Sequence, residues 1–222
     1  MNIRIEWVYK LPKKNNTYKM ISDVMPVKEA LLLEEDLTRT GRVVSYQFFD
    51  GDDDSWTKKE LLAFLKEMET EPHDLIAYID GGYNKVTRDA GLGIALYYKQ
   101  NGQRWRYRVN ERIESIENNN EAEFAALAYL LTICEELGIH HEPITIHTDS
   151  KTLYHQINGE WPSYEQTLTR WLDRIESNTT RLGIKADYKL LPRHENKEAD
   201  QLASQALQNI LISGKKEQAK TK

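Results

Sequence analysis

Four acidic residues stand where predicted strands end or predicted helices begin. Asp80 and Asp149 each close a strand, and Glu123 and Asp200 each open a helix. A carboxylate at the end of a buried strand is costly unless a partner neutralises it. Oxygen ligands with no Cys or His among them favour Mg²⁺ or Mn²⁺. The four residues therefore predict a divalent-metal site, and the chemistry that such a site supports is metal-assisted phosphodiester cleavage.

The elements that position these residues belong to a chain of 222 residues, which has room for one ordinary domain and a small one. Cys134 is the only cysteine and lies in an apolar helical stretch, so we expect a small buried side chain, no disulfide and a reducing compartment. No stretch reaches the roughly 20 apolar residues that span a bilayer, and residues 1–10 lack the apolar run of a signal peptide. We therefore predict a cytoplasmic protein with no membrane partner.

The net charge of −5 argues at first sight against a polyanion as partner. The carboxylates of a metal site would contribute several of these charges, however, and bound cations would reverse the local field. Lysines gather in two places on this acidic chain, beside three aromatic residues near the N-terminus and in the tail. The first group is Lys10, Lys13, Lys14 and Lys19 beside Trp7, Tyr9 and Tyr18, and the second is Lys215, Lys216, Lys220 and Lys222.

Residues 1–72 are predicted to form a small α+β domain with the element order ββαβα. Partial alternation of apolar and polar residues indicates strands, and a proline near a helix start or a capping box indicates helices. The predicted elements are strands at 3–9 and 18–24, a helix from Pro26 to Gly41, a strand at 43–49, and a helix capped by Thr57 and Glu60.

The acidic loop of this domain begins like a calcium-binding loop, with Asp50, Asp52 and Asp54 at alternate positions. The sixth position is Ser55 rather than the required glycine, and the twelfth is Leu61 rather than glutamate. We therefore interpret the loop as a solvated segment that leads into the following helix.

From residue 73 to residue 212 the pattern is that of an α/β domain. Asn101-Gly102 is a strong hairpin signal between two of three successive strands. Three hairpin-joined strands followed by β-α-β-α alternation predict a mixed five-stranded sheet with helices on both faces. The basic tail, residues 213–222, is predicted to be disordered. The predicted strands are 75–80, 90–99, 103–112, 144–149 and 184–191, and the predicted helices are 120–137, 150–157, 164–182 and 196–211.

Five short motifs in this domain carry a family resemblance. Each is moderately specific alone, but their order, spacing and placement on strand or helix ends form a specific set. Together they resemble the type 1 ribonuclease H family over about Leu75–Leu207, and the preceding domain is of no recognised type. The motifs are YIDGG at 78–82, AGLGIAL at 90–96, NNEAEF at 119–124, HTDSK at 147–151 and ENKEADQLA at 195–203.

The resemblance implies that Asp80, Glu123, Asp149 and Asp200 are catalytic and hold two Mg²⁺ or Mn²⁺ ions per active site, with Asp80 as the bridging ligand. Glu121 competes with Glu123 for its role, but Glu123 has the family's spacing from an asparagine pair. Taken singly, each carboxylate has an ordinary reading as a helix cap or a surface charge. These separate interpretations do not explain why all four carboxylates occur together at the positions that the family resemblance implies.

The resemblance also implies contacts with the substrate. Asn119 and Asn120 match positions that contact the RNA strand, where amides can bond a 2′-hydroxyl, and helix capping is the alternative. Asn196 matches a residue that orders the metal site, and Thr148 and Ser150 are candidates for phosphate contact or for local capping. The expected substrate contacts are Gly81, Asn119, Asn120, Thr148, Ser150, Arg193, Asn196, Lys13 and Lys14.

Three features depart from the family's pattern. The turn after the first strand reads GYNKVTRDAG, where the family has a turn rich in Gly and Asn. The family's histidine before the last aspartate has no aligned counterpart, so His194 is the nearest candidate for proton transfer and Arg193 the alternative as a charge stabiliser. The family's basic handle is replaced by the short NGEWPSYEQTL. Grip on the substrate is therefore expected from the N-terminal domain, with Lys13 and Lys14 on phosphates, unless that domain serves packing or dimerisation.

The leading hypothesis is an endoribonuclease that hydrolyses the RNA strand of RNA–DNA hybrids by a two-metal-ion mechanism, leaving 5′-phosphate and 3′-hydroxyl ends. The altered turn and the missing histidine motivate an alternative, a catalytically degenerate protein that binds nucleic acid without cutting it. A third reading, an enzyme of the wider superfamily that acts on DNA, fits the asparagine pair less well. The expected partner is an RNA–DNA hybrid, and no obligate protein partner is inferred.

Overall fold

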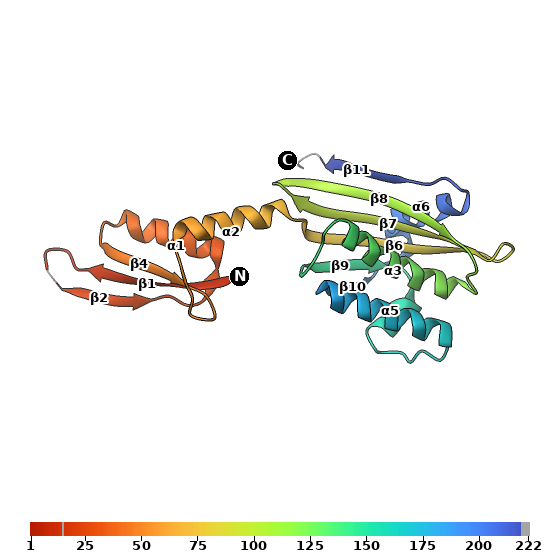
Figure 1. The fold of residues 1–222 in the computed structure, drawn as a ribbon, viewed down its shortest axis with the longest axis horizontal. Coiled ribbons are helices and arrows are strands. Elements are labelled where there is room, and N and C mark those ends of the chain that lie inside the picture. The colour runs from red at the N-terminus through yellow and green to blue at the C-terminus, as the bar shows by residue number, and fades with distance from the viewer. Residues whose placement is uncertain (15, 219–222) are drawn as a thin grey trace. The chain divides into compact units, whose positions relative to one another are not determined.

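The computed structural model describes residues 1–14 and 16–218. The chain divides into two compact units, Met1–Met68 and Glu69–Lys222 (Figure 1). Each unit has its own hydrophobic core, and the two are treated separately below.

The first unit is a small antiparallel sheet covered by helices, in the strand order β2-β1-β4-β5. The predicted ββαβα order is present, with two additional two-residue strands. Ile3, Ile5, Phe48 and Leu61 are fully buried where the sheet meets the helices. The elements are β1 (Asn2–Lys10), β2 (Thr17–Ile21), β3 (Met25–Pro26), α1 (Val27–Arg39), β4 (Val43–Phe49), β5 (Ser55–Trp56) and α2 (Lys58–Thr70).

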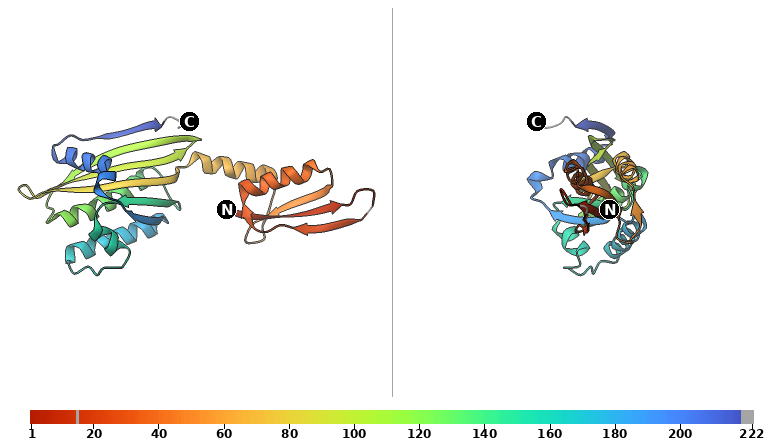
Figure 2. Two further views of the ribbon diagram at one scale, coloured as in Figure 1. Left: turned by 180° about the vertical axis from the view of Figure 1, so that it is seen from behind. Right: turned by 90° about the vertical axis from the view of Figure 1, so that its left-hand side faces the viewer.

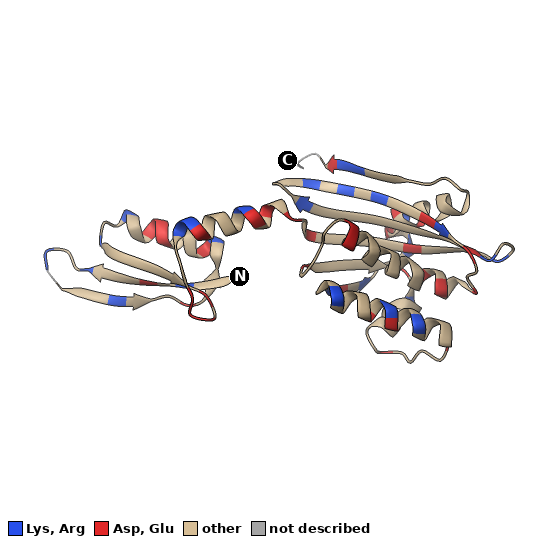
Figure 3. Ribbon diagram, viewed as in Figure 1, with Lys and Arg blue, Asp and Glu red and all other residues tan. Residues whose placement is uncertain are grey.

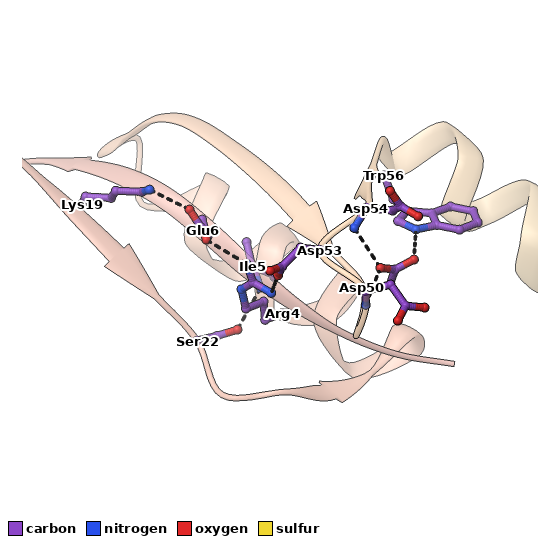
Figure 4. Close-up of polar contacts among 10 residues, drawn as sticks. Arg4, Ile5, Glu6, Lys19, Ser22, Asp50, Asp53, Asp54 and Trp56 are labelled. Carbon is purple, nitrogen blue, oxygen red and sulfur yellow. Dashed lines mark hydrogen bonds and ion pairs between the residues drawn. The ribbon is translucent and has the colours of Figure 1, made fainter.

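The acidic loop of this unit is organised by its own hydrogen bonds (Figure 4). The Asp50 carboxylate accepts the backbone N–H groups of Asp52 and Asp54 and the indole N–H of Trp56. The predicted capping box is confirmed, because the Glu60 carboxylate accepts the backbone N–H of Thr57 at 2.7 Å and Thr57 Oγ1 accepts that of Glu60 at 3.2 Å. The loop therefore leads into α2, as the sequence indicates.

The second unit is built on a mixed sheet with the strand order β10-β9-β6-β7-β8-β11 (Figure 2). The hairpins β6–β7 and β7–β8 are antiparallel, and β9 pairs in parallel with both β6 and β10. This arrangement confirms the predicted mixed sheet. The strands are β6 (His73–Asn84), β7 (Asp89–Gln100), β8 (Gln103–Ile113), β9 (Pro143–Thr148), β10 (Lys185–Leu190) and β11 (Ser213–Gln218).

Helices cover both faces of this sheet, as predicted. A Cβ atom on Gly81 would collide with α3 at Ala122, whereas one on Gly82 would lie 3.2 Å from Leu207 of α6. Because successive strand residues point to opposite faces, α3 and α6 lie on opposite sides. The helices are α3 (Asn119–Glu136), α4 (Lys151–Ile157), α5 (Gln166–Leu182) and α6 (Lys197–Leu207), with a 3₁₀ turn η1 at Arg193–Glu195.

The prediction of a disordered tail is wrong for residues 213–218. They form β11, which pairs with β8 and adds a sixth strand to the sheet. The ammonium of Lys215 lies over the rings of Trp105, at 4.2 Å, and Tyr98, at 5.0 Å. This cation–π contact anchors a strand that has no apolar pattern of its own. Residues 219–222 of the expected tail lie outside the described residues.

Arginines recur along β8 (Figure 3). Arg104, Arg106 and Arg108 occupy alternate positions and so share the face of the sheet that α6 covers. Glu198 of α6 pairs with Arg106 at 3.3 Å and with Arg108 at 3.2 Å. The single carboxylate of Glu198 therefore offsets one of the three positive charges of this stripe.

Cys134 is buried and unpaired, in agreement with the expected small core side chain. None of the helices in the described part of the chain has an apolar stretch long enough to cross a membrane.

Candidate active site

Two parallel strands bring two of the predicted carboxylates to the same edge of the sheet. Tyr78 of β6 pairs with His147 of β9, so Asp80 lies two residues further along β6 and Asp149 lies directly after the last residue of β9. The predicted end of the first strand at Asp80 is wrong, because antiparallel pairing with β7 continues β6 to Asn84. Asp80 pairs with Gly93 on its other side, which makes β6 an interior strand at this point. Strand pairing alone therefore places these two acids side by side.

A glycine allows the third carboxylate to join them. A Cβ atom at Gly81 would lie 2.3 Å from the backbone carbon of Ala122, a distance that no side chain tolerates. With no side chain there, the first turns of α3 pack directly on β6, and the backbone N–H of Gly81 hydrogen-bonds the Glu123 carboxylate. The glycine therefore fixes Glu123 beside Asp80.

Asp80, Glu123 and Asp149 each offer a carboxylate oxygen, and these oxygens lie within 4.8 Å of one another. Asp80 is 7% exposed and Glu123 is 6% exposed. Burial, together with the negative charges of Asp149 and Asp200, raises the pKa of Asp80 to about 7. Burial and the charges of Asp80 and Asp149 raise the pKa of Glu123 well above its usual range. Like charges held this close repel one another, and the arrangement is costly without a cation.

The donor set fits a hard divalent cation. All the clustered ligand atoms are carboxylate oxygens, the type that Mg²⁺ and Mn²⁺ prefer. Glu123 Oε2 is buried with no hydrogen-bond partner in the described part of the structure. A cation would satisfy this orphaned carboxylate oxygen.

Asn196 connects the end of η1 to both strands of the site. It is fully buried, and its Nδ2 donates to the Ile79 carbonyl at 2.9 Å and to Asp149 Oδ1 at 3.1 Å. These bonds hold Asp149 against the strand that carries Asp80. These hydrogen bonds are the contacts expected of a residue that orders the carboxylates of the site.

Asp200 lies near the other three carboxylates but outside their group. Its charge acts on Asp80, yet its carboxylate accepts a hydrogen bond from the Arg193 guanidinium at 3.2 Å. Its side chain is 41% exposed. The structure thus brings three of the four predicted ligands together and leaves the fourth paired with an arginine.

His194 is not brought into the carboxylate group. Its side chain is 74% exposed, and its nearest charged partner is Glu195, 3.6 Å away. Arg193, from the same 3₁₀ turn, is the residue that reaches toward the carboxylates. Asp200, Asp149 and Asp80 all raise the pKa of its guanidinium, which bonds Asp200 directly.

The structure shows which of Glu121 and Glu123 lies with the other carboxylates. The Glu121 carboxylate accepts the backbone N–H of Glu117 at 2.7 Å and the indole N–H of Trp171 at 3.1 Å. The side chain of Asn118 accepts the Glu121 N–H, so Asn118 is the N-cap of α3. Glu121 therefore serves the helix start, and Glu123 is the glutamate that joins Asp80 and Asp149.

The other predicted substrate contacts fall into two sets. Thr148 is buried and its Oγ1 accepts the Ser150 N–H, while Ser150 Oγ accepts the Leu153 N–H as the cap of α4. Both hydroxyls therefore have local roles. Asn119 is exposed and Asn120 half-buried, and capping by Asn118 leaves their amides available. Lys13 and Lys14 are exposed in the β1–β2 turn of the other unit.

Sequence reasoning missed one feature of this region. Asn119 and Asn120 line a cavity of about 500 Å³ together with Tyr83 and Lys85, which belong to the β6–β7 hairpin. The one sequence feature that pointed to this region is the hairpin segment GYNKVTRDAG, which differs from the family's turn rich in Gly and Asn.

Comparisons with known proteins agree with this geometry. A family model described as Reverse transcriptase-like matches residues 78–206. An uncharacterized Bacillus subtilis (strain 168) protein, YpeP, is 36% identical over 190 residues, which are 86% of this chain and 84% of that protein.

Solved ribonucleases H1 have the same fold. The enzyme from Halobacterium salinarum NRC-1 is 25% identical, with a TM-score of 0.52 over 61% of this chain and 98% of that one. LC11-RNase H1, solved in complex with an RNA/DNA hybrid, is 23% identical, with a TM-score of 0.55 over the same shares, and shows the likeness of fold alone. The expected relationship to type 1 ribonucleases H is thus confirmed, and the chain belongs to the reverse transcriptase-like, ribonuclease H-like family.

Proposed function

We propose that the protein is an endoribonuclease that hydrolyses the RNA strand of RNA–DNA hybrids and leaves 5′-phosphate and 3′-hydroxyl ends. The observation that carries the proposal is the group of three carboxylates, Asp80, Glu123 and Asp149, within 4.8 Å of one another. The burial of Asp80 and Glu123, their raised pKa values and the orphaned Glu123 Oε2 support a cation-binding role for this group. The family supplies the reaction class.

Asp80, Glu123 and Asp149 would hold two Mg²⁺ or Mn²⁺ ions, with Asp200 completing the set. Bound cations of this kind lower the pKa of a water nucleophile and stabilise the leaving oxygen. The chain's own residues prepare the site: Asn196 fixes the Asp149 carboxylate, and the Gly81 N–H fixes that of Glu123. Preorganisation of this kind avoids rearrangement during the reaction.

Recognition of the RNA strand is assigned to Asn119 and Asn120, one helical turn before Glu123. Their amides can donate to and accept from a 2′-hydroxyl, the group that distinguishes RNA from DNA. Support comes from the Asn118 cap, which takes the capping role from both amides, and from the solved LC11-RNase H1, whose structure contains an RNA/DNA hybrid. Lys13 and Lys14 are assigned to substrate phosphates, and a cytoplasmic location is part of the same proposal.

Hydrolysis of an end-labelled RNA–DNA hybrid tests this function. We expect cleavage with Mg²⁺ or Mn²⁺, none with EDTA, and a loss of roughly a thousandfold or more with Asp80→Asn, because several kcal/mol of charge stabilisation disappear. Asp187→Asn is the matched control, since this carboxylate is 61% exposed and pairs with Lys189 on β10. In the same assay, Lys13→Gln with Lys14→Gln should raise the Michaelis constant alone.

Intact hybrid at saturating Mn²⁺, with folded wild-type protein, would overturn the proposed activity. Tight hybrid binding under those conditions would establish the alternative, a protein that keeps the fold and binds nucleic acid without cutting it. Equal cleavage of a DNA duplex would instead remove the assigned role of Asn119 and Asn120.

A further inference from the structure

The helix α6 covers one part of its face of the sheet. It packs on β6, β7 and β8, and a Cβ atom on Gly91 or Gly93 would collide with its backbone. Its first turn reaches Tyr97, whose hydroxyl donates to Glu198. Beyond this turn, on the same face, a groove of about 1030 Å³ crosses the sheet from β10 to β11. Within the described part of the second unit, this groove is an open surface.

The floor of the groove is apolar in the middle of the sheet. Ile76 is 40% exposed there, and Tyr78 and Tyr97 lie beside it on β6 and β7. The Tyr78 ring stacks on His147 of β9, with ring centroids 4.7 Å apart, and meets Tyr97 of β7 edge to face. Because β6 lies between β9 and β7, Tyr78 has a ring on each side. Bases that bind by stacking need a free ring face, so this floor suits aliphatic side chains better than bases.

The charged side chains around this floor leave positive charge uncompensated. Four acids line the groove, and three of them already pair with cations of the fold. The fourth, Glu195, is 54% exposed beside His194. Arg104 and Lys185 are exposed at opposite ends of the groove, and neither side chain has a hydrogen bond or an ion pair among residues 1–14 and 16–218. Acidic side chains of a partner would complement these two ends. The three existing pairs are Asp74 with Lys99, Asp187 with Lys189, and Glu198 with Arg106 and Arg108.

The length of the groove and the pairing of its strands favour a helix as the occupant. Four interstrand spacings separate β10 from β8, about 19 Å in all, and an α-helix of about 13 residues spans this distance. The N–H and C=O groups of the interior strands pair within the sheet, so the floor offers no backbone partner to a peptide. An extended peptide would therefore bury unpaired backbone groups, whereas a helix pairs its own.

We propose that this groove docks an acidic amphipathic helix of a partner protein. Apolar side chains of that helix lie on Ile76, Tyr78 and Tyr97, and carboxylates near its two ends meet Arg104 and Lys185. A helix that places one apolar face in a groove is a recurring mode of peptide recognition. None of the three clustered carboxylates lines the groove, so the inference is independent of the proposed function.

Fluorescence anisotropy of labelled probe peptides, titrated with the full chain, tests this docking. The probe is a capped helical peptide of about 13 residues with leucines on one face and with glutamates and alanines on the rest. One matched peptide carries lysines in place of the glutamates, and a second has the same composition with its leucines spread around the helix. We expect a dissociation constant on the order of micromolar for the acidic probe, and binding at least about tenfold weaker for both matched peptides.

Variants of the full chain locate the docking site. Arg104→Glu combined with Lys185→Glu should weaken binding of the acidic probe about tenfold and reduce its salt dependence. Ile76→Thr keeps a β-branched residue in the strand and should weaken binding about threefold through lost apolar contact. Arg170→Glu is the matched control, because Arg170 is exposed on α5, which packs on α3 at the other face of the sheet. Thermal melts by circular dichroism establish that each variant is folded.

Failure of the wild-type protein to bind the acidic probe would overturn the docking surface, as would equal affinity for the lysine peptide or an equal loss with Arg170→Glu. Two further outcomes would assign the groove to another occupant and so overturn the proposal. One is displacement of the probe by single-stranded DNA that itself binds the wild type but not the Arg104→Glu, Lys185→Glu protein. The other is a wild-type dimer in sedimentation velocity that the same double variant abolishes.

Discussion

Arg193 donates a hydrogen bond to Asp200 across 3.2 Å, and Asp200 lies outside the group formed by the other three carboxylates. The Arg193 side chain is 81% exposed and comes from a short 3₁₀ turn, so it is free to leave. A guanidinium and a divalent cation both neutralise carboxylates. In the proposed two-ion site, Arg193 would therefore compete with a cation for Asp200.

Replacing Arg193 with Gln should tighten Mn²⁺ binding about twofold to fivefold, the change expected when one exposed charge pair no longer competes. Isothermal titration calorimetry measures the dissociation constant directly. Arg181→Gln is the matched control, because Arg181 pairs with Glu135 near the far end of α3. Weaker or unchanged Mn²⁺ binding by Arg193→Gln would contradict the competition.

The stability of the ion-free protein should fall as pH rises from about 4 to about 7. Below this range Asp80 is protonated in both the folded and the unfolded chain. Above it, the folded chain holds a carboxylate whose pKa is raised to about 7 by burial first and by Asp149 and Asp200 second. The pKa of an aspartate in the unfolded chain is near 4, so the higher pKa of Asp80 in the folded chain lowers the free energy of unfolding by on the order of 4 kcal/mol above this range. The raised pKa of Glu123 lowers the stability in the same direction.

Thermal melts in EDTA at pH 5 and pH 8 measure this loss. Asp80→Asn should raise the melting temperature of the ion-free protein at pH 8 and flatten its pH dependence, whereas the exposed Asp187→Asn should leave both unchanged. Added Mn²⁺ should restore stability mainly at the higher pH. A wild-type melting temperature that is higher at pH 8 than at pH 5 would show that the carboxylate group is not the source.

Replacing Gly81 with Ala should destabilise the fold by about 1–3 kcal/mol, because the added methyl group would overlap the α3 backbone at Ala122. Displacement of α3 would also move Glu123 and weaken Mn²⁺ binding. Gly51→Ala, at a position with nothing within 4 Å of the added atom, should change neither property. Urea denaturation gives the free energy of unfolding. If this free energy were the same for Gly81→Ala as for the wild type, the close packing of α3 on residue 81 would not be the reason for a glycine there.

The sequence predicts the three clustered carboxylates because each depends on a local pattern. Asp80 and Asp149 end apolar runs that form strands, and parallel pairing of these strands then brings the two acids together. Glu123 lies at the start of a long apolar helix. The capping box of α2 was predictable for the same reason, since both partners lie within four residues.

The features that escaped prediction depend on side chains far apart in the chain. β11 has no apolar alternation, and its anchor is Lys215 over Trp105, which is 110 residues away in the sequence. The pairing of Asp200 with Arg193 rather than with Asp80 depends on side-chain orientation, which spacing does not specify. Asn118, rather than either of its two asparagine neighbours, caps α3, because that choice is set by backbone geometry at one residue.

The strand formed by residues 213–218 has a practical consequence for anyone who produces this protein. A recombinant version that stops at residue 212 would leave β8 with a row of unpaired N–H and C=O groups, the surface through which chains aggregate edge to edge. Removing the same residues would also uncover the rings of Trp105 and Tyr98. Recombinant versions should therefore keep residues 213–218, and affinity tags belong at the N-terminus.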